Sequence, residues 1–394
     1  MLDKPESPKL TFANRRDSIY PYYAGFSEQF VESILRKVNA SAGDLILDPW
    51  NGSGTTTAVC SRKGIYAVGV DLNPAMKPIA AVRSMSGELL REVCQHAAVI
   101  IKAAPLVQES VSPFSFCGEL FNVAKRTSDP TLHDGLRFGF MVACRAIARQ
   151  TRSKNPTWYS LNSLRSLVVT QPVICAELAS AFAALQAWKS DTLPLEQSVS
   201  PNLITADWAT FRWRRSASHV ITSPPYLTRI DYVMKTLPEL LFLSEEQSID
   251  LKALRQTMLG GVLTKTLPNK LSSLENEVVY DALEKIRSHK SKASDTYYLR
   301  FFYQYFSRLR RSITNFTRSP SGPDTITVVT QGSYYKEIFV DLPLIVDEFL
   351  RANGFVKNSA TTFRGSNNMV SVNSRSAASG FASPPETAAT YERA

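Results

Sequence analysis

The chain has 394 residues, of which 44% are hydrophobic and 20% are charged, and its formal net charge is +10. This composition excludes an intrinsically disordered chain. It predicts a globular protein with two or three domain-sized units, or one large α/β domain that carries insertions. The positive charge favours a polyanionic partner, although many basic proteins bind no nucleic acid.

The cysteines, the histidines and the hydropathy exclude further classes of protein. Five scattered cysteines lack a Cys-x-x-Cys spacing and predict reduced thiols, and four widely separated histidines make a zinc or other metal site unexpected. Residues 1–10 lack the apolar core of a signal peptide, and no run of 18 apolar residues occurs. We therefore expect a cytoplasmic protein without a membrane span.

Residues 1–48 predict an arm, a helix and a first strand. The arm leads into an aromatic cluster over residues 20–26, and Ser27 is a suitable N-cap for a helix over residues 28–38. Residues 44–48 then form a short apolar run that predicts a buried strand.

A glycine-bearing turn follows this strand, reading Asp-Pro-Trp-Asn-Gly-Ser-Gly-Thr-Thr over residues 48–56. Glycines let the backbone approach a ligand, and the start of the next helix offers N–H groups to an anion. A second buried strand, residues 65–70, ends at Asp71, about 20 residues beyond the turn, where an acid can bind ribose hydroxyls. Because Thr57 replaces the third glycine of the dinucleotide fingerprint, the pattern favours a mononucleoside-type cofactor over NAD.

Residues 84–200 change to longer helical stretches and predict a helical insertion. Near its middle, the basic residues Arg145, Arg149, Arg152 and Lys154 precede an Asn-Pro-Thr-Trp-Tyr run that contains Trp158 and Tyr159. Basic residues interleaved with aromatics suit a nucleic-acid groove, but a solvated basic helix face followed by a loop is equally ordinary.

The sheet resumes at residues 202–206, which end in Asp207, and at residues 218–222, which run into a Ser-Pro-Pro-Tyr turn over residues 223–226. Each proline fixes its φ and lacks an N–H group, so the turn is stiff and its carbonyl oxygens remain available as acceptors. Taken alone, the turn favours a proline-rich loop after an edge strand. However, Asp48, Asp71, Asp207 and Ser223 end four predicted strands, and the ends of parallel strands share one edge of a sheet, where ligands bind.

The C-terminal third alternates helices and strands. Residues 244–294 predict a polar second insertion, after which we expect a helix, a strand and a second helix over residues 297–316, 325–329 and 342–353. Residues 355–372 predict a terminal hairpin. The Ser/Ala/Pro-rich tail, residues 373–394, lacks a core-forming pattern and predicts disorder.

At residues 48–56 and 222–226 the chain resembles the amino-group DNA methyltransferases that use S-adenosylmethionine. Residues 48–56 are similar to the family's Asp-Pro-Phe-x-Gly-x-Gly-Thr-Thr cofactor loop, with Trp50 in place of phenylalanine, and residues 222–226 are similar to its Ser-Pro-Pro-Tyr catalytic loop. The resemblance implies an α/β, Rossmann-like class I methyltransferase fold, with a mostly parallel twisted sheet, helices on both faces and helical insertions.

The resemblance also implies a division of the chain. An arm and the cofactor-binding half would occupy residues 1–83, and the catalytic half residues 201–243, with the insertion of residues 84–200 between them. The second insertion, residues 244–294, would precede the C-terminal part of the core, residues 295–372. Target recognition would fall to one or both insertions, with the larger share for residues 84–200.

Roles for individual residues follow from the same resemblance. The cofactor would lie against Asp48, Trp50, Gly52, Ser53, Gly54, Thr55, Asp71 and Asp207, with Asp71 at the ribose and Asp207 at the adenine amino group. The stretch over residues 20–26 would close over the methionine end. Catalysis would fall to Ser223, Pro224, Pro225 and Tyr226, whereas His219 is expected to be a strand residue. Nucleic-acid contacts are expected from Arg152, Lys154, Trp158 and Arg229.

In this family, a serine before the two prolines is more often associated with methylation of cytosine N4, and an aspartate or asparagine with methylation of adenine N6. We therefore expect a cytosine-N4 methyltransferase that acts on double-stranded DNA with a flipped base, in restriction–modification or phage defence. The alternatives are adenine N6, an RNA or tRNA amine methyltransferase, and a non-catalytic DNA-binding subunit on the same fold.

Overall fold

The computed structural model describes residues 5–8, 19–20, 25, 27–151, 158–188, 198–227, 230–264, 276–318, 322–363 and 384–394. Within them a seven-stranded sheet has the order β3-β2-β1-β4-β5-β9-β8. Its strands are β1 Leu45–Asp48, β2 Tyr66–Asp71, β3 Asn202–Thr205, β4 His219–Thr222, β5 Thr325–Gln331, β8 Phe355–Phe363 and β9 Glu386–Arg393. The first five pair in parallel, and β9 runs antiparallel to both of its neighbours.

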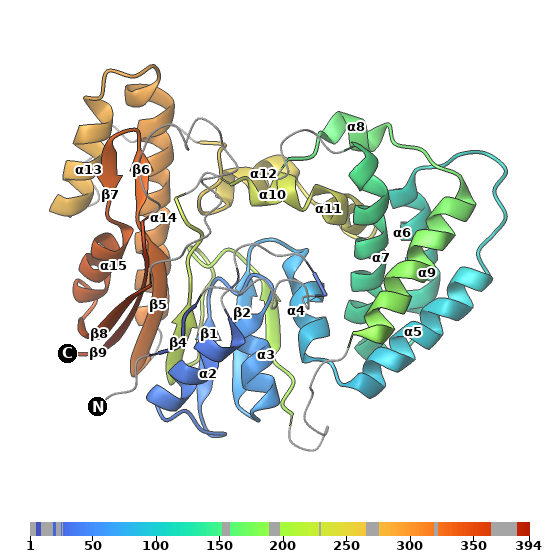
Figure 1. The fold of residues 1–394 in the computed structure, drawn as a ribbon, viewed down its shortest axis with the longest axis horizontal. Helices are drawn as coiled ribbons and strands as arrows, with labels where there is room; N and C mark the ends of the chain where they lie inside the picture. The colour runs from blue at the N-terminus through green and yellow to red at the C-terminus, as the bar shows by residue number, and fades with distance from the viewer. Residues whose placement is uncertain are drawn as a thin grey trace.

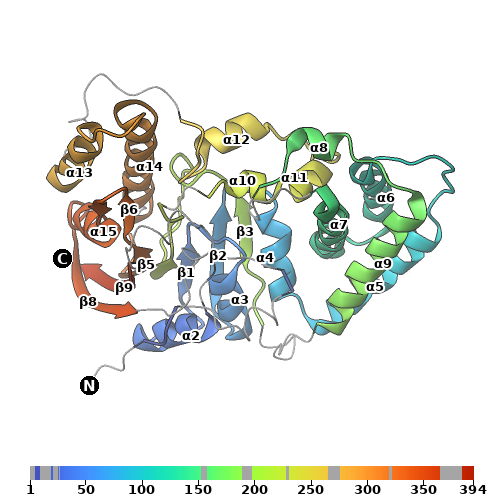
Figure 2. The ribbon, with the colours of Figure 1, turned by 45° about the horizontal axis from the view of Figure 1, so that its top comes forward.

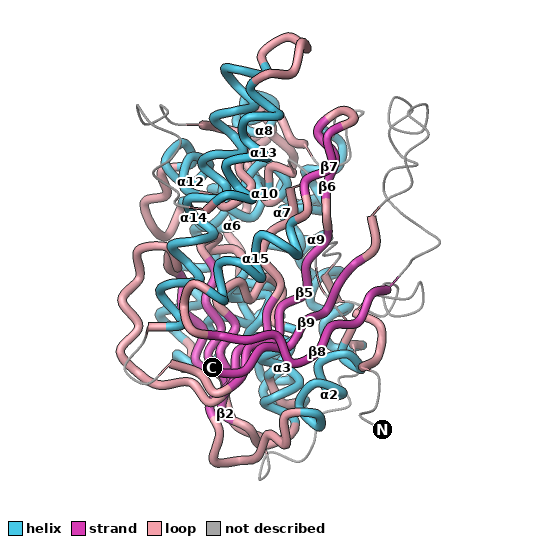
Figure 3. The backbone as a smooth tube through the Cα atoms, turned by 90° about the vertical axis from the view of Figure 1, so that its left-hand side faces the viewer, coloured by secondary structure: helices cyan, strands magenta, loops and turns pink. Residues whose placement is uncertain are grey.

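The two faces of the sheet carry different helices. Figure 3 shows α14 (Leu299–Thr317) and α15 (Leu342–Arg351) on one side of the strands, and α2 (Glu28–Lys37) and α3 (Thr55–Arg62) on the other. Alternate strand residues point to opposite faces, so Leu47 joins the α14 side of the core and Ile46 the α2 side. Since both faces are covered, β1 and β4 are buried along their whole lengths. The Rossmann-like α/β prediction is confirmed.

The described residues between 84 and 188 are mostly helical and stand beside the sheet (Figure 1). The helices are α5 Gly87–Lys102, α6 Pro113–Thr127, α7 His133–Ala148, α8 Leu161–Arg165 and α9 Gln171–Ala187, with the short 3-10 turns Pro130–Leu132 and Arg149–Thr151. Two core helices, α4 (Met76–Ser84) and α11 (Leu237–Ser244), pack against them. Phe140 of α7 stacks on Phe242 of α11 with ring centroids 5.8 Å apart, so the helices α5 to α9 share a hydrophobic core with α11.

The remaining elements rise above the carboxyl ends of the strands. In Figure 2 the helical unit, which consists of α5 to α9, lies on one side of the strand ends, and α13, α14 and β6 lie on the other. The helices α10 to α12 lie between these two groups. These elements are α10 Tyr232–Lys235, α12 Leu251–Thr257, α13 Glu277–Arg287, a π-helix over Ser294–Tyr298, and the strands β6 Ser333–Tyr335 and β7 Ile338–Val340. No helix in the described part of the chain is both long and apolar enough to cross a membrane.

The C-terminus departs from the predictions. The terminal hairpin exists, but the partner of β8 is β9, which lies beyond residues 355–372. The prediction of a disordered tail is wrong for residues 386–393, while residues 373–383 lie outside the described part of the chain. β9 is short of large apolar residues, but it pairs on both sides, with β5 and β8, so its backbone groups are satisfied by two ladders. Its small residues Ala388 and Ala389 are buried beneath the covering helices.

Candidate active site

A pocket opens at the carboxyl edge of the sheet, where the four predicted strand ends meet. Asp48 ends β1 and Asp71 ends β2, while Asp207 and Ser223 lie in the loops that follow β3 and β4. All four residues line this pocket. Parallel strands in register bring their carboxyl ends to one edge, as the sequence analysis expected.

The glycine turn after β1 forms one wall of the pocket. Gly54 adopts a left-handed φ of 81° as the residue before α3, and its N–H donates to the Asn51 carbonyl at 2.8 Å. A Cβ atom on Gly54 would lie 2.5 Å from the Cβ atom of Ala80, so the close approach of α4 leaves no room for a side chain. Gly52, Ser53 and Thr55 line the same pocket.

Asp48 joins this turn to β4. Its Oδ1 atom accepts hydrogen bonds from the Thr222 hydroxyl at 2.6 Å and from the Trp50 N–H at 3.2 Å. Burial raises the pKa of Asp48 to about 6, although the hydrogen bond from Thr222 opposes this shift. Thr222 directly precedes Ser223, so this buried contact, together with the pairing of β1 and β4, fixes the spacing between the two predicted loops.

Asp71 closes the other side of the turn. Its carboxylate accepts the Gly52 N–H at 2.9 Å and the Asn73 N–H at 2.8 Å. Burial raises the pKa of Asp71 to about 6, against the lowering effect of these two backbone donors. The carboxylate is therefore held in place at the position expected for a ribose partner.

Asp207 lies in the pocket but carries a partner that the sequence analysis missed. The Arg308 guanidinium, from α14, donates to its Oδ1 atom at 2.6 Å, and the Ala209 N–H donates to the same atom at 3.1 Å. Trp50 lines the pocket too, with its ring edge-on to Phe316 at a centroid distance of 6.2 Å. Two residues of α14 thus stand behind the part of the pocket assigned to the adenine.

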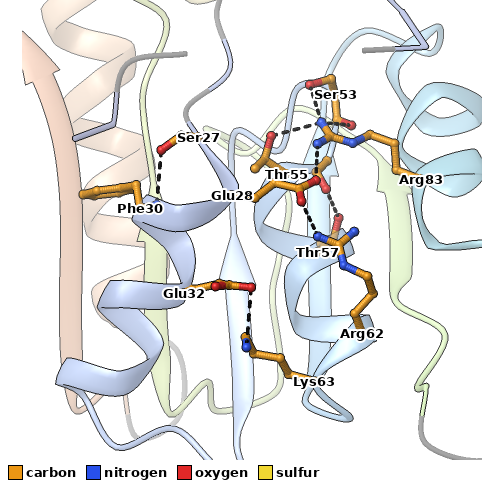
Figure 4. A network of polar contacts seen from close by, with 11 residues as sticks. Ser27, Glu28, Phe30, Glu32, Ser53, Thr55, Thr57, Arg62, Lys63 and Arg83 are labelled. Atoms are coloured by element: carbon orange, nitrogen blue, oxygen red, sulfur yellow. Dashed lines mark hydrogen bonds and ion pairs between the residues drawn. The ribbon is translucent and has the colours of Figure 1, made fainter. Parts of the chain in front are cut away.

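A buried arginine behind the glycine turn was also missed. Figure 4 shows Arg83 of α4 reaching the turn, where it donates to the hydroxyls of Ser53 at 3.3 Å and Thr55 at 3.1 Å. Its other nitrogen pairs with Glu28 at 2.9 Å, and Glu28 also pairs with Arg62 at 2.6 Å. The turn is therefore fixed from outside the pocket by helices on both of its flanks. An isolated arginine in an apolar helix gave no signal in the sequence.

The Ser-Pro-Pro-Tyr turn lines the pocket opposite the glycine turn. The Tyr305 hydroxyl, from α14, donates to the Pro225 carbonyl at 2.6 Å, and the Tyr226 hydroxyl donates to Glu386 at 3.3 Å. Burial, and then the Glu386 carboxylate, raise the pKa of Tyr226 well above its ordinary value. Glu386 is the first residue of β9, so a strand predicted to be disordered holds the tyrosine of the predicted catalytic loop.

Comparisons with known proteins agree with this geometry. Residues 6–82, which contain the glycine turn and Asp71, match the family model for N6/N4 methyltransferases, described as DNA methylase. The resemblance to the amino-group DNA methyltransferases is confirmed. A 65-residue stretch is 42% identical to the type II methyltransferase M.MjaII of Methanocaldococcus jannaschii and 40% identical to the type II methyltransferase M.BsoBI of Geobacillus stearothermophilus. It makes up 16% of this chain, 12% of the first relative and 13% of the second.

S-adenosylmethionine is the methyl donor of these amino-group DNA methyltransferases, and the pocket fits it chemically. Asp71 and Asp207 supply acceptors for hydroxyl and amino groups, Trp50 supplies an aromatic wall, and Gly52 adds no side chain to the pocket. Gly54 is not among the residues that line the pocket, and its missing side chain makes room for α4. The described residues contain no group of three or more His, Cys, Asp and Glu side chains that could hold a metal ion.

A largely buried ion pair lies at one end of the pocket. Arg145 of α7 pairs with Glu239 of α11, and its guanidinium also donates to the Tyr20 hydroxyl and the Lys235 carbonyl, both at 2.8 Å. Arg145 is therefore not part of a solvated helix face, whereas the nucleic-acid groove predicted for this stretch stays a prediction. Helical periodicity does not reveal which neighbour covers a basic residue. Tyr20 lines the pocket, whereas the rest of the predicted aromatic cluster lies largely outside the described residues.

The residues expected to contact nucleic acid are mostly not described. Arg152, Lys154 and Arg229 fall outside the described part of the chain. Trp158 is partly buried against the helical core, and the Arg255 guanidinium lies 5.5 Å from the centre of its ring. Trp158 therefore packs between the insertion and α12.

His219 lies at the opposite end of β4 from the catalytic turn. It is the first residue of this strand, is buried, and hydrogen-bonds through Nδ1 to the Thr325 hydroxyl of β5 at 2.8 Å. Burial lowers its pKa. These contacts make it a strand residue, as predicted.

Proposed function

We propose that the protein transfers a methyl group from S-adenosylmethionine to the exocyclic N4 amine of cytosine in double-stranded DNA. One observation carries the proposal: the Ser-Pro-Pro-Tyr turn and the glycine turn line one pocket and are joined by the Thr222–Asp48 hydrogen bond of 2.6 Å. A methyl donor on one turn and an amine on the other would thus meet at a spacing that the fold fixes.

The donor would be held mainly by the β1 and β2 ends of the pocket. Asp71 would accept the ribose hydroxyls, and Asp207 would take the adenine amino group through Oδ2, because Arg308 already occupies Oδ1. Asp48, Gly52, Ser53, Gly54 and Thr55 would surround the methionine part. When bound, S-adenosylmethionine supplies an electrophilic methyl group.

The catalytic turn would prepare the amine. The lone pair of an exocyclic base amine is delocalised into the ring, so attack is favoured by acceptors that hold its N–H groups and draw the nitrogen toward tetrahedral geometry. The Ser223 hydroxyl and the Pro224 carbonyl suit this role, because Tyr305 already occupies the Pro225 carbonyl. Tyr226, fixed through its hydroxyl by Glu386, would stack on the flipped base.

Two features support cytosine and restriction–modification as the finer assignment. Serine precedes the two prolines, which in this family goes more often with cytosine N4 than with adenine N6. Both relatives carry the name type II methyltransferase, which supports a role in restriction–modification. Recognition of the DNA sequence would fall mainly to the helical unit of residues 84–200, which shares a core with α11.

The test is incubation with isotope-labelled cofactor and either mixed-sequence duplex DNA or RNA, followed by digestion to nucleosides. We expect label in N4-methylcytosine from DNA. Label in N6-methyladenine, or in RNA alone, would replace the proposed substrate with one of the alternatives. DNA binding with no methylated base in either polymer would point to the non-catalytic subunit. The Ser223→Ala variant is the matched negative control, since it keeps the cofactor turn intact.

A further inference from the structure

A second depression lies along α14, separate from the Ser-Pro-Pro-Tyr turn. One wall is the segment that leaves β3, and the other is α14 from Tyr303 to its carboxyl end. It is lined by Ala209, Thr210, Arg212, Trp213, Arg214, Tyr303, Ser307, Arg310, Arg311, Thr314, Asn315 and Arg318. We call these twelve residues the arginine groove. The proposed function uses none of them.

The arginine groove is held in a fixed shape by its own floor. Asn315 donates through Nδ2 to the carbonyls of Trp208, at 2.7 Å, and Phe211, and the Trp208 indole N–H donates to the Ser312 carbonyl at 3.2 Å. The ring of Trp213 lies against that of Trp208, with centroids 6.2 Å apart. The segment is therefore fastened to α14, and its arginines project from a rigid base, which lowers the entropy cost of binding a ligand.

The helix wall presents one continuous polar stripe. Ser307, Arg310, Arg311, Thr314 and Arg318 recur at intervals of one, three and four, which places them on one side of α14. The opposite side carries the buried aromatic residues that pack on the sheet. The arginines are therefore not needed to bury this helix, and another reason must account for their position.

The positive charge of the arginine groove favours the binding of an anion. Five guanidinium groups line it, of which that of Arg310 already has an interaction of its own, and among the described residues the lining contains no Asp or Glu. Like charges that share a depression repel one another unless counter-anions are supplied. Guanidinium groups bind phosphate with two parallel N–H bonds, and hydroxyls such as those of Ser307 and Thr314 add neutral donors.

The length of the arginine groove fits a polymer of phosphates. From Tyr303 to Arg318 the helix rises about 22 Å at 1.5 Å per residue. Duplex DNA presents one phosphate about every 3.4 Å along each strand, so several phosphates span this length. The same helix also lines the active-site pocket, through Arg308 and Ser312, which places the two depressions on adjacent sides of one element.

We propose that the arginine groove binds the phosphodiester backbone of duplex DNA outside the target base. The inference rests on the proposed function, because the partner is the DNA that would be methylated. It adds a contact surface on the core of the enzyme, distinct from the helical unit, that supplies affinity independent of base sequence.

The test measures how salt affects the affinity for a mixed-sequence duplex. In the triple variant R212Q/R214Q/R311Q we expect at least tenfold weaker binding at low salt. The slope of log K against log salt concentration should be shallower by about 0.9 for each phosphate that the variant no longer neutralises. The single variant R311Q should lower the slope by about one such step. R36Q is the matched control, because Arg36 is also an exposed helical arginine but lies on α2, on the opposite face of the sheet.

An unchanged affinity and slope in the folded triple variant, checked by thermal melting, would overturn the inference. So would a weakening confined to RNA. The methyl-transfer rate at saturating DNA should be that of the wild type in the triple variant, whereas Ser223→Ala should lose turnover and keep the full salt slope. If no base is methylated yet the triple variant has the shallower salt slope, the DNA contact stands and the proposed chemistry fails.

Discussion

The two turns that face each other across the pocket are fixed in different ways. The glycine turn is held by nearby residues: Gly54 by Asn51, and Gly52 by Asp71, 19 residues away in the chain. The Ser-Pro-Pro-Tyr turn is held by residues that are distant in the sequence. Tyr305 lies 80 residues from its partner Pro225, and Glu386 lies 160 residues from its partner Tyr226. The first turn is thus held largely within its own βαβ unit, apart from the contact of Asp48 with Thr222, whereas the second is held by α14 and β9.

This difference predicts that damage to the two turns has separable consequences. Changes near the glycine turn should alter cofactor affinity, and changes near the catalytic turn should alter turnover. We expect the largest effects from residues of the catalytic turn itself, and the smallest from the distant residues that hold it.

Ser223→Ala and Tyr226→Ala should each reduce kcat by a factor on the order of 10²–10³, the usual effect of removing a group that positions or stabilises the transition state. The cofactor dissociation constant, measured by calorimetry, should stay within about twofold of the wild type. A comparable loss of cofactor affinity would mean that the two turns are not separate in function.

Asp71→Ala should weaken cofactor binding by about 30–100-fold, equivalent to about 2–3 kcal/mol, because it removes a charged acceptor and releases the Gly52 N–H. Asp71→Asn is the matched control, since its amide oxygen can still accept from Gly52. It should fall between the wild type and Asp71→Ala. Equal affinities in all three proteins would remove Asp71 from the cofactor site.

Cofactor affinity should decrease as the pH falls through about 6. Burial raises the pKa of both Asp48 and Asp71 to about 6, above the value of an unfolded chain, so each carboxyl is protonated in the folded protein below that pH and ionised above it. A protonated Asp71 is a poorer acceptor for ribose hydroxyls. Titration of the dissociation constant should show up to about a tenfold loss per pH unit for one group. The profile should flatten in Asp71→Asn.

Tyr305→Phe should lower kcat by about three- to tenfold, which corresponds to one buried hydrogen bond of about 1 kcal/mol, and leave cofactor affinity unchanged. The released Pro225 carbonyl would then compete with Pro224 for the amine. Tyr334→Phe, at an exposed position of β6, is the control and should match the wild type in both measurements. A Tyr305→Phe protein with normal turnover would show that the catalytic turn keeps its shape without α14.

Sequence patterns were sufficient to predict those features of the structure that depend on residues close together in the chain. The glycine turn, the acid at the end of β2 and the cap at Ser27 each depend on residues within one βαβ unit or one helix turn. Parallel pairing then brings Asp48, Asp71, Asp207 and Ser223 to one edge, because strand ends of like direction must coincide. These local rules predicted the fold class and the location of the pocket.

Only the tertiary structure decided which distant residues complete the site. Arg83, Tyr305 and Arg308 lie on helices whose periodicity reports a buried face but not the partner that each polar side chain meets. β9 carries no apolar alternation, because its stability comes from two ladders and small buried residues, and neither is visible in a stretch of Ala and Thr. The sequence by itself thus determined a pocket at the edge of a parallel sheet. Long-range packing determined how its catalytic turn is held.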